Sequence, residues 1–137
     1  MKQDGPELTV FLYSFGYQQS GIPTDESGHG GGFVFDCRAL PNPYWDDTLR
    51  PHRGTAPPIA AFMQAHPQVS AFAEHAGALV LRSAHTYREL RRERLMVAFG
   101  CTGGRHRSVY LAEVLAKTLR AAGIRVVLRH LDIEREG

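Results

Sequence analysis

The chain has 137 residues, of which 43% are hydrophobic and 22% charged, and its formal net charge is +2. This length predicts one globular domain spanning residues 1–137, with a core from about residue 8 to about residue 131. No apolar run is long enough to cross a bilayer and the start, MKQDGP, is polar, so we expect a cytoplasmic protein. The near-balanced charge does not by itself favour a nucleic-acid partner. Two cysteines, Cys37 and Cys101, are expected to be free thiols.

Short β-branched and aromatic runs alternate with segments of helical periodicity. The predicted strands are residues 8–13 (LTVFLY), 33–37 (FVFDC), 95–99 (LMVAF) and 125–131 (RVVLRHL). Helices are predicted over residues 55–65, from residue 67 to an end within 83–93, and from 107 to 122. The Gly-rich residues 16–32 predict a loop, and the prolines within 40–47 predict a turn-rich, non-helical segment. Together these elements predict an α/β fold with a mainly parallel sheet flanked by helices.

The densest chemistry follows the third predicted strand, in the segment GCTGGRHRS, residues 100–108. A helix N-terminus presents unpaired N–H groups at the positive end of the helix dipole, and two glycines let the backbone approach a ligand closely. An arginine there can hold phosphate oxygens two at a time. We therefore predict a phosphate-binding loop made of Thr102, Gly103, Gly104, Arg105, His106, Arg107 and Ser108.

A Gly-rich turn from strand to helix can also be no more than a tight connection. Against that alternative, Arg105, His106 and Arg107 are cationic or nearly so, and they oppose the helix dipole unless an anion offsets them. Ligands of parallel sheets lie outside the carboxyl ends of the strands. Three predicted loops meet this condition, namely those that begin near residues 15, 38 and 100.

Six segments also carry a family resemblance: SFG (14–16), GIP (21–23), VFDCR (34–38), LPNPYW (40–45), LRP (49–51) and GCTGGRHRSVYLAE (100–113). Together they resemble the C-terminal domain of the RapZ RNase-adaptor family. The resemblance implies an α/β domain related to a phosphofructokinase subdomain. Such a domain is a non-catalytic regulator that binds an amino-sugar phosphate such as glucosamine-6-phosphate and, in some members, small regulatory RNAs. The family's Walker motif GxxxxGK[ST] does not occur in this sequence, so nucleotide hydrolysis is not expected.

The resemblance also directs attention to further residues and partners. On the sugar side the candidates are Ser14, Gly16, Ser20, Gly21, Arg38 and Asn42. Tyr44 and Trp45 either cap the core or stack on a sugar or base. The expected partners are a phosphorylated small molecule, structured small RNA, an RNase and further copies of the chain, with RNA contacts at Arg125, Arg129 and His130. No cofactor is predicted, and no histidine spacing suggests a metal site.

This sequence departs from the family pattern in two loops and in its tail. Family members commonly place a histidine before the GIP glycine, where this chain has Ser20. A Gly-rich insertion, residues 28–32, contains His29, which is a candidate substitute for that histidine. The tail LDIEREG is mixed in sign, whereas the tails of some members are strongly basic. These departures bear on sugar specificity and on RNA binding.

An enzymatic alternative rests on the same loop, because residues 101–108 fit the pattern C-x-x-G-x-x-R-S of cysteine phosphatases. The Cys101 thiolate would attack phosphorus while Arg107 holds the oxygens. The general acid is not evident from the sequence, and Asp46 is a candidate beside Asp36 and Asp47. The longer family motif accounts for the same residues, with Cys101 as a small buried side chain.

Overall fold

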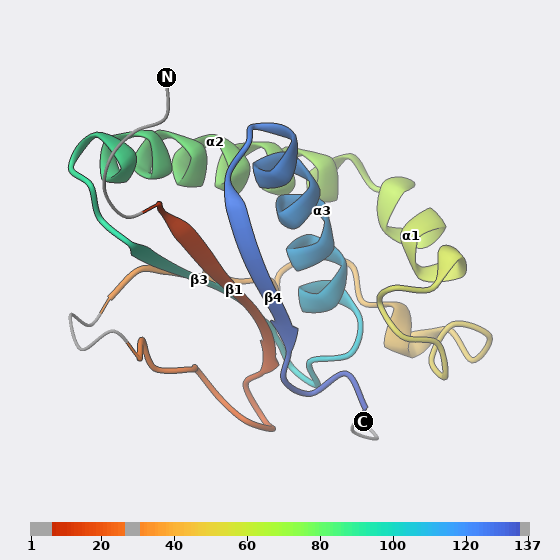
Figure 1. Cartoon of the computed structure of the whole chain (residues 1–137). Coiled ribbons are helices and arrows are strands. Elements are labelled where there is room, and N and C mark those ends of the chain that lie inside the picture. Colours follow the sequence, from red (N-terminus) through yellow and green to blue (C-terminus); the bar gives the residue numbers. More distant parts are fainter. Residues whose placement is uncertain (1–6, 27–30, 135–137) are drawn as a thin grey trace.

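The computed structural model of the protein describes residues 7–26 and 31–134. Figure 1 shows a four-stranded parallel sheet in the order β2-β3-β1-β4. The strands are β1 (Thr9–Gly16), β2 (Phe33–Asp36), β3 (Arg94–Cys101) and β4 (Arg125–His130). The helices are α1 (Pro57–Gln64), α2 (Pro67–Glu89) and α3 (Arg107–Ala121), with a 3-10 turn, η1 (Pro43–Trp45). The predicted α/β class and parallel sheet are confirmed.

One face of the sheet carries the larger hydrophobic core. Alternate residues of the two central strands are buried there, such as Val10 and Leu12 of β1 and Val97 and Phe99 of β3. Helix α3 contacts β1, β3 and β4, and α2 packs against α3 and β3 (Figure 1). No helix in the described part of the chain is long and apolar enough to span a membrane.

The opposite face of the same strands carries a second, smaller cluster. Tyr13 and Phe15 of β1 and Met96 and Ala98 of β3 are buried in it. Burial on both faces explains why the runs of β1 and β3 are apolar throughout rather than alternating. The two central strands are therefore buried on both faces, and loops of the candidate site extend from their carboxyl ends.

The structure corrects several predicted boundaries. Strand β1 continues past the predicted end at Tyr13, because its parallel pairing with β3 runs on to Gly16 opposite Cys101. The second and last strands each end one residue earlier than predicted, at Asp36 and His130. The expectation of no helix in residues 40–47 was wrong for η1, where a proline takes the first position and Asn42 Oδ1 accepts a hydrogen bond from the Tyr44 N–H at 3.0 Å. His29 lies outside the described residues.

Replacing Leu12 by Ala tests the core assignment. Leu12 has 0% exposure in a central strand, so we expect the free energy of unfolding to fall by about 2–5 kcal/mol through lost burial and the cavity left behind. Leu90, which is 58% exposed, gives a matched control, and its change to Ala should alter stability by about 0.5 kcal/mol or less. Urea unfolding followed by circular dichroism measures both. Equal effects of the two substitutions would contradict the assignment.

Candidate anion-binding site

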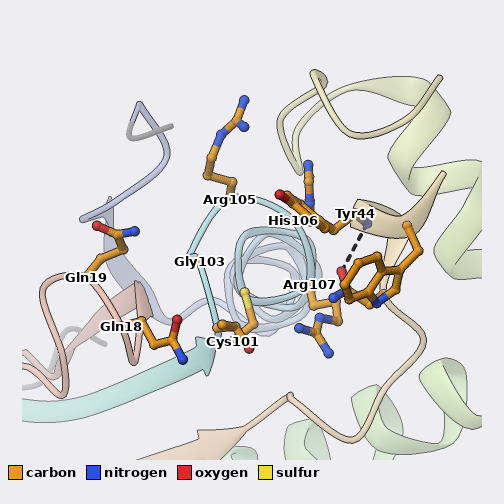
Figure 2. A pocket seen from close by; sticks show the side chains of 11 residues that line it. Gln18, Gln19, Tyr44, Cys101, Gly103, Arg105, His106 and Arg107 are labelled. Atoms are coloured by element: carbon orange, nitrogen blue, oxygen red, sulfur yellow. Dashed lines mark hydrogen bonds between the residues drawn. The ribbon is translucent and has the colours of Figure 1, made fainter. Parts of the chain in front are cut away.

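A pocket of about 300 Å³ opens at the carboxyl edge of the sheet. Three loops build its walls, one after each of β1, β2 and β3 (Figure 2). Its lining residues are Gln18, Gln19, Asn42, Tyr44, Trp45, Cys101, Thr102, Gly103, Arg105, His106 and Arg107. The pocket thus lies at the edge of the sheet where the sequence predicted ligand binding. Loops that are far apart in the chain meet around it.

The loop between β3 and α3 supplies backbone donors to this pocket. Among the described residues, no backbone carbonyl accepts a hydrogen bond from the N–H groups of Gly103, Gly104 or Arg105. Gly104 has a φ of 78° and packs against β1, since a Cβ there would lie 2.6 Å from the nitrogen of Gly16. Only glycine fits that position without strain. Such a run of N–H groups before a helix N-terminus favours an anion.

Arg107 is held in the wall of the pocket with part of its donor capacity unused. The residue is 4% exposed, and its Nη1 donates to the carbonyl oxygens of Arg38 at 2.9 Å and Leu40 at 3.1 Å. Its buried Nε has no hydrogen-bond partner within the described residues. An unsatisfied buried donor costs about 1–3 kcal/mol, more when it is charged.

Residues 50–54 form hydrogen bonds with Arg105 and His106 of the predicted phosphate-binding loop. The Gly54 N–H donates to the carbonyl of Arg105 at 2.6 Å, and Arg105 Nη2 donates to the carbonyl of Pro51 at 3.2 Å. His106 Nε2 lies 2.7 Å from the carbonyl of His52 and 3.1 Å from that of Arg50. Because carbonyl oxygens only accept, Nε2 must carry a proton.

His106 does not add the positive charge that the sequence suggested. Burial lowers its pKa below the ordinary value of 6.5, and the nearby Arg105 and Arg107 lower it further, although the carbonyl partners act in the opposite direction. The ring is therefore neutral at pH 7, with its proton on Nε2 and a lone pair on Nδ1. The two arginines and the backbone N–H groups carry the positive potential of the loop.

The wall after β2 is aromatic. Trp45 is 77% exposed and meets Tyr44 edge to face at 5.3 Å between ring centroids, so Trp45 does not cap the core. Arg50 Nε donates to the Tyr44 carbonyl at 2.7 Å, and its guanidinium carbon lies 4.9 Å from the centre of the Tyr44 ring. A fixed aromatic surface at the mouth of a pocket suits stacking against a sugar ring or base.

Not every residue predicted for the site lines the pocket. Thr102, Gly103, Arg105, His106 and Arg107 do, whereas Gly104 and Ser108 are buried and do not line it. Of the six sugar-side candidates, the lining includes Asn42 and omits Ser14, Gly16, Ser20, Gly21 and Arg38. Gln18 and Gln19 line the pocket and were missed; their place in a loop after a strand was the available signal.

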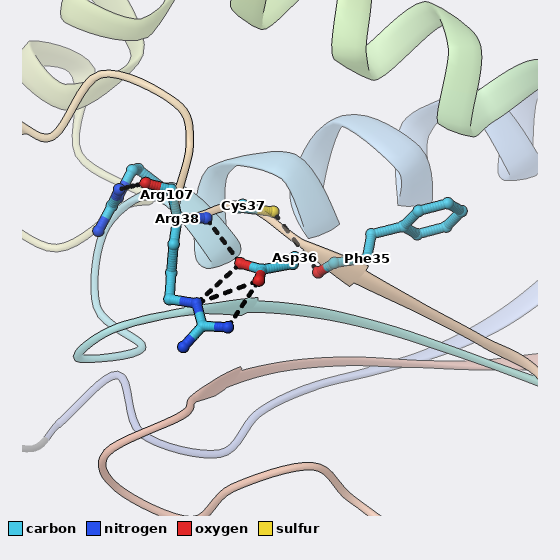
Figure 3. Close-up of polar contacts among 5 residues, drawn as sticks. All are labelled: Phe35, Asp36, Cys37, Arg38 and Arg107. Carbon is cyan, nitrogen blue, oxygen red and sulfur yellow. Dashed lines mark hydrogen bonds and ion pairs between the residues drawn. The ribbon is translucent and has the colours of Figure 1, made fainter.

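The omitted sugar-side residues have identifiable structural contacts. Ser14 is buried, with its Oγ 2.6 Å from His130 Nδ1. Ser20 Oγ donates to Asp132 Oδ1 at 2.5 Å. Figure 3 shows Arg38 folded back onto Asp36, which it binds at 2.7 Å, and its guanidinium also lies 3.8 Å from the centre of the Tyr17 ring. The hydrogen bonds from Arg38 lower the pKa of Asp36.

The three residues predicted to contact RNA differ in their accessibility. Arg125 is exposed but pairs with Glu7 at 2.6 Å, and Arg129 is exposed on β4. His130 is half-buried, and its second ring nitrogen, Nε2, lies 2.7 Å from Glu113 Oε2. With Ser14 at one ring nitrogen and Glu113 at the other, His130 supports the fold rather than offering a surface contact.

The contacts of the candidate general acids do not favour phosphatase chemistry. Cys101 is 2% exposed, and its Sγ lies 3.2 Å from Ser108 Oγ. The Asp46 carboxylate accepts hydrogen bonds from the Thr48 hydroxyl and N–H, which lower the pKa of Asp46. A general acid needs the opposite shift, because it must hold a proton near neutral pH. Asp36, with its pKa lowered as well, has the same disadvantage.

These features describe an α/β domain with a candidate anion site at a strand–loop–helix junction, and comparisons with known proteins give its family. The family model described as the RapZ C-terminal domain matches residues 8–134. A nucleotide-binding protein of Laribacter hongkongensis is 47% identical over 128 residues, covering 93% of this chain and 44% of that protein. The RNase adapter protein RapZ of Escherichia coli is 43% identical over 137 residues, covering 94% of this chain and 43% of that protein. The chain belongs to the RapZ C-terminal domain family and spans less than half the length of these relatives.

The protonation of His106 gives a testable pH dependence. Because its pKa is lower in the folded than in the unfolded chain, the unfolded chain binds the proton first as pH falls below about 6.5, and stability is lost. We expect the ring to titrate below 6.5 by NMR, with His106→Gln used for assignment. Between pH 7.5 and 5.5, chosen to span about one unit either side of an ordinary histidine pKa, the variant should lose less stability than the wild type. A midpoint at or above 6.5 would contradict the burial argument.

Proposed function

We propose that this domain is a non-catalytic regulatory module that binds a phosphorylated small molecule in the pocket, namely an amino-sugar phosphate such as glucosamine-6-phosphate. The observation that carries the proposal is Arg107, buried in the pocket wall with an Nε that no described residue accepts from. A phosphate at the N-terminus of α3 would accept from this guanidinium and from the loop N–H groups.

The rest of the pocket suits a small polar ring. Its volume of about 300 Å³ is at the lower end of ligand cavities. The side-chain amides of Gln18, Gln19 and Asn42 can both donate to and accept from hydroxyl groups. Tyr44 and Trp45 provide an apolar surface for the face of the ring. The proposed pose therefore places the phosphate on the Thr102–Arg107 side and the sugar between the amides and the aromatic wall.

The family supports a wider regulatory role. Relatives from Escherichia coli and Klebsiella pneumoniae are named RNase adapter protein RapZ. By extension we propose that this domain, in the cytoplasm and as part of a homo-oligomer, adapts an RNase to its RNA and responds to the bound phosphate ester. Cysteine phosphatase chemistry is the alternative function. It is less favoured because the lowered pKa of Asp46 makes this residue a poor general acid.

Arg107→Ala should weaken phosphate-ester binding. Loss of a charge-assisted pair of hydrogen bonds costs about 2–3 kcal/mol, which lowers affinity roughly thirtyfold to more than a hundredfold. Isothermal calorimetry with glucosamine-6-phosphate, glucose-6-phosphate and inorganic phosphate measures the effect. Arg120→Ala is the matched control, since Arg120 lies in the last turn of the same helix and should leave affinity unchanged.

Two further variants keep this experiment interpretable. Arg107 bonds two carbonyls of the β2 loop, so its loss could disturb the fold, and the midpoint of thermal unfolding must be measured in parallel. Arg105→Ala removes a guanidinium that contacts a single carbonyl, that of Pro51, and we expect a weaker loss of affinity with little change in stability. Equal binding by wild type and both variants would place the ligand elsewhere.

RNA binding by the domain alone should be weak and strongly dependent on salt, because phosphate contacts dominate such binding and the net charge is only +2. Filter binding of a structured RNA at low and moderate salt, with Arg125→Ala/Arg129→Ala beside wild type, tests this. We expect the double variant to bind less and to show a smaller salt slope. If binding is undetectable even at low salt, the RNA proposal fails for this domain. If binding is unchanged in the double variant, the contacts lie on another surface.

A further inference from the structure

Asp132 occupies an unusual place just beyond the end of β4. It is 1% exposed and does not line the pocket. Its Oδ2 accepts from the N–H of Gly16 at 2.8 Å and from the N–H of Ser20 at 3.2 Å. Its Oδ1 accepts from the hydroxyl of Ser20 at 2.5 Å. A single carboxylate from the C-terminal segment therefore takes donors from both ends of the turn that follows β1.

That turn carries the two glutamines of the pocket. The carbonyl of Gly16 accepts from the N–H groups of Gln19 at 3.0 Å and Gly21 at 2.9 Å, which closes the turn. On its other side the N–H of Gln18 donates to the carbonyl of Thr102 at 3.1 Å. Figure 2 shows Gln18 and Gln19 on one side of the pocket, with Tyr44 and Arg107 on the other. We call Gln18 and Gln19 the glutamine wall of the pocket. Its position depends on the contacts that hold residues 16–21.

We propose that Asp132 is a positioning residue that sets the glutamine wall, and with it the preference of the pocket for a phosphate ester of a polyhydroxyl compound over inorganic phosphate. This inference rests on the function proposed above. Charge-assisted bonds to three donors are stronger and more directional than neutral ones, so the carboxylate fixes the turn before any ligand arrives. Preorganised contacts bind more tightly because less ordering is required on binding.

Ser20 stands where family members commonly have a histidine, and the proposal gives it a supporting role. The hydroxyl of Ser20 is directed to Asp132, and Ser20 does not line the pocket. In this chain Ser20 therefore helps to hold the turn through Asp132, while Gln18 and Gln19 supply the polar atoms that face a ligand. Recognition of the non-phosphate part is expected to come from amide groups rather than from an imidazole.

Asp132 also lies close to residues 102–107, which we call the anion loop. The binding of inorganic phosphate can therefore be compared with that of a sugar phosphate. A Cβ on Gly104 would come within 2.8 Å of Asp132 Cβ, so the buried carboxylate opposes an anion there. Inorganic phosphate needs the loop and not the glutamine wall, whereas a hexose phosphate needs both. Loss of positioning should therefore lower the affinity for the ester selectively. General damage to the fold should lower the affinity for both ligands.

The experiment compares the full chain with Asp132→Ala, Asp132→Asn and Ser20→Ala by calorimetry, using inorganic phosphate and glucose-6-phosphate as probes. We expect Asp132→Ala to bind glucose-6-phosphate about tenfold more weakly, as for loss of one or two net hydrogen bonds. Inorganic phosphate should bind equally well or better. Asp132→Asn should largely restore ester binding, because its oxygen can accept from Gly16 and Ser20 while its amide donates to the Ser20 hydroxyl. Ser20→Ala should show a smaller ester-selective loss.

Glu134→Gln is the matched control, since it neutralises a carboxylate two residues further on, which pairs with Arg53 at 2.5 Å on the surface. It should leave the ratio of the two affinities unchanged. An unchanged ratio in Asp132→Ala, or an equal loss for both probes, would overturn the positioning role while leaving the phosphate site intact. If Asp132→Ala does not fold, an unchanged ratio in Ser20→Ala is the contradicting result. Failure of the wild type to bind either probe, and glucosamine-6-phosphate as well, would instead overturn the proposed function, and this inference with it.

Discussion

The site depends on a direct backbone contact between the end of β1 and the loop after β3. A Cβ on Gly16 would lie 2.6 Å from the carbonyl carbon of Gly103, and one on Gly104 would lie 2.6 Å from the nitrogen of Gly16. Side chains would therefore push the loops apart, and glycine is required at both places. The contact brings the glutamine turn against the anion loop, and the β1–β3 pairing that ends at Gly16 and Cys101 fixes its register.

The electrostatics of the pocket follow from how each polar group is held. Arg107 is anchored by two carbonyls of the β2 loop, so its charge cannot swing into solvent. Burial keeps His106 neutral, which limits the positive charge that the fold must stabilise without a ligand. Asp132 places a buried negative charge behind the loop. The fold can therefore hold two arginines beside a helix N-terminus, where the charges favour an anion.

The sequence predicted the fold class and the edge where the loops meet, because strand and helix patterns are local and the carboxyl ends of parallel strands share one edge. The residues that face the pocket were harder to predict. Ser20 and Arg38 were plausible ligand contacts by position, yet Asp132 and Asp36 hold them. These partners are 112 residues apart in the first pair and 2 in the second, and neither pairing has a periodicity that a single sequence reveals. Gln18 and Gln19 were missed for the same reason, because only the closed turn shows which side chains face inward.

The most direct test of the phosphate site is an NMR titration of the nitrogen-15 labelled chain with glucosamine-6-phosphate and with inorganic phosphate. We expect both ligands to shift the backbone amide resonances of Gly103, Gly104 and Arg105 and the side-chain Nε–H resonance of Arg107. The amide resonances of β4, none of whose residues lines the pocket, should not shift. Only the sugar ester should also shift the side-chain amides of Gln18 and Gln19. Saturable shifts confined to other parts of the chain, with residues 102–107 unchanged, would contradict the central claim.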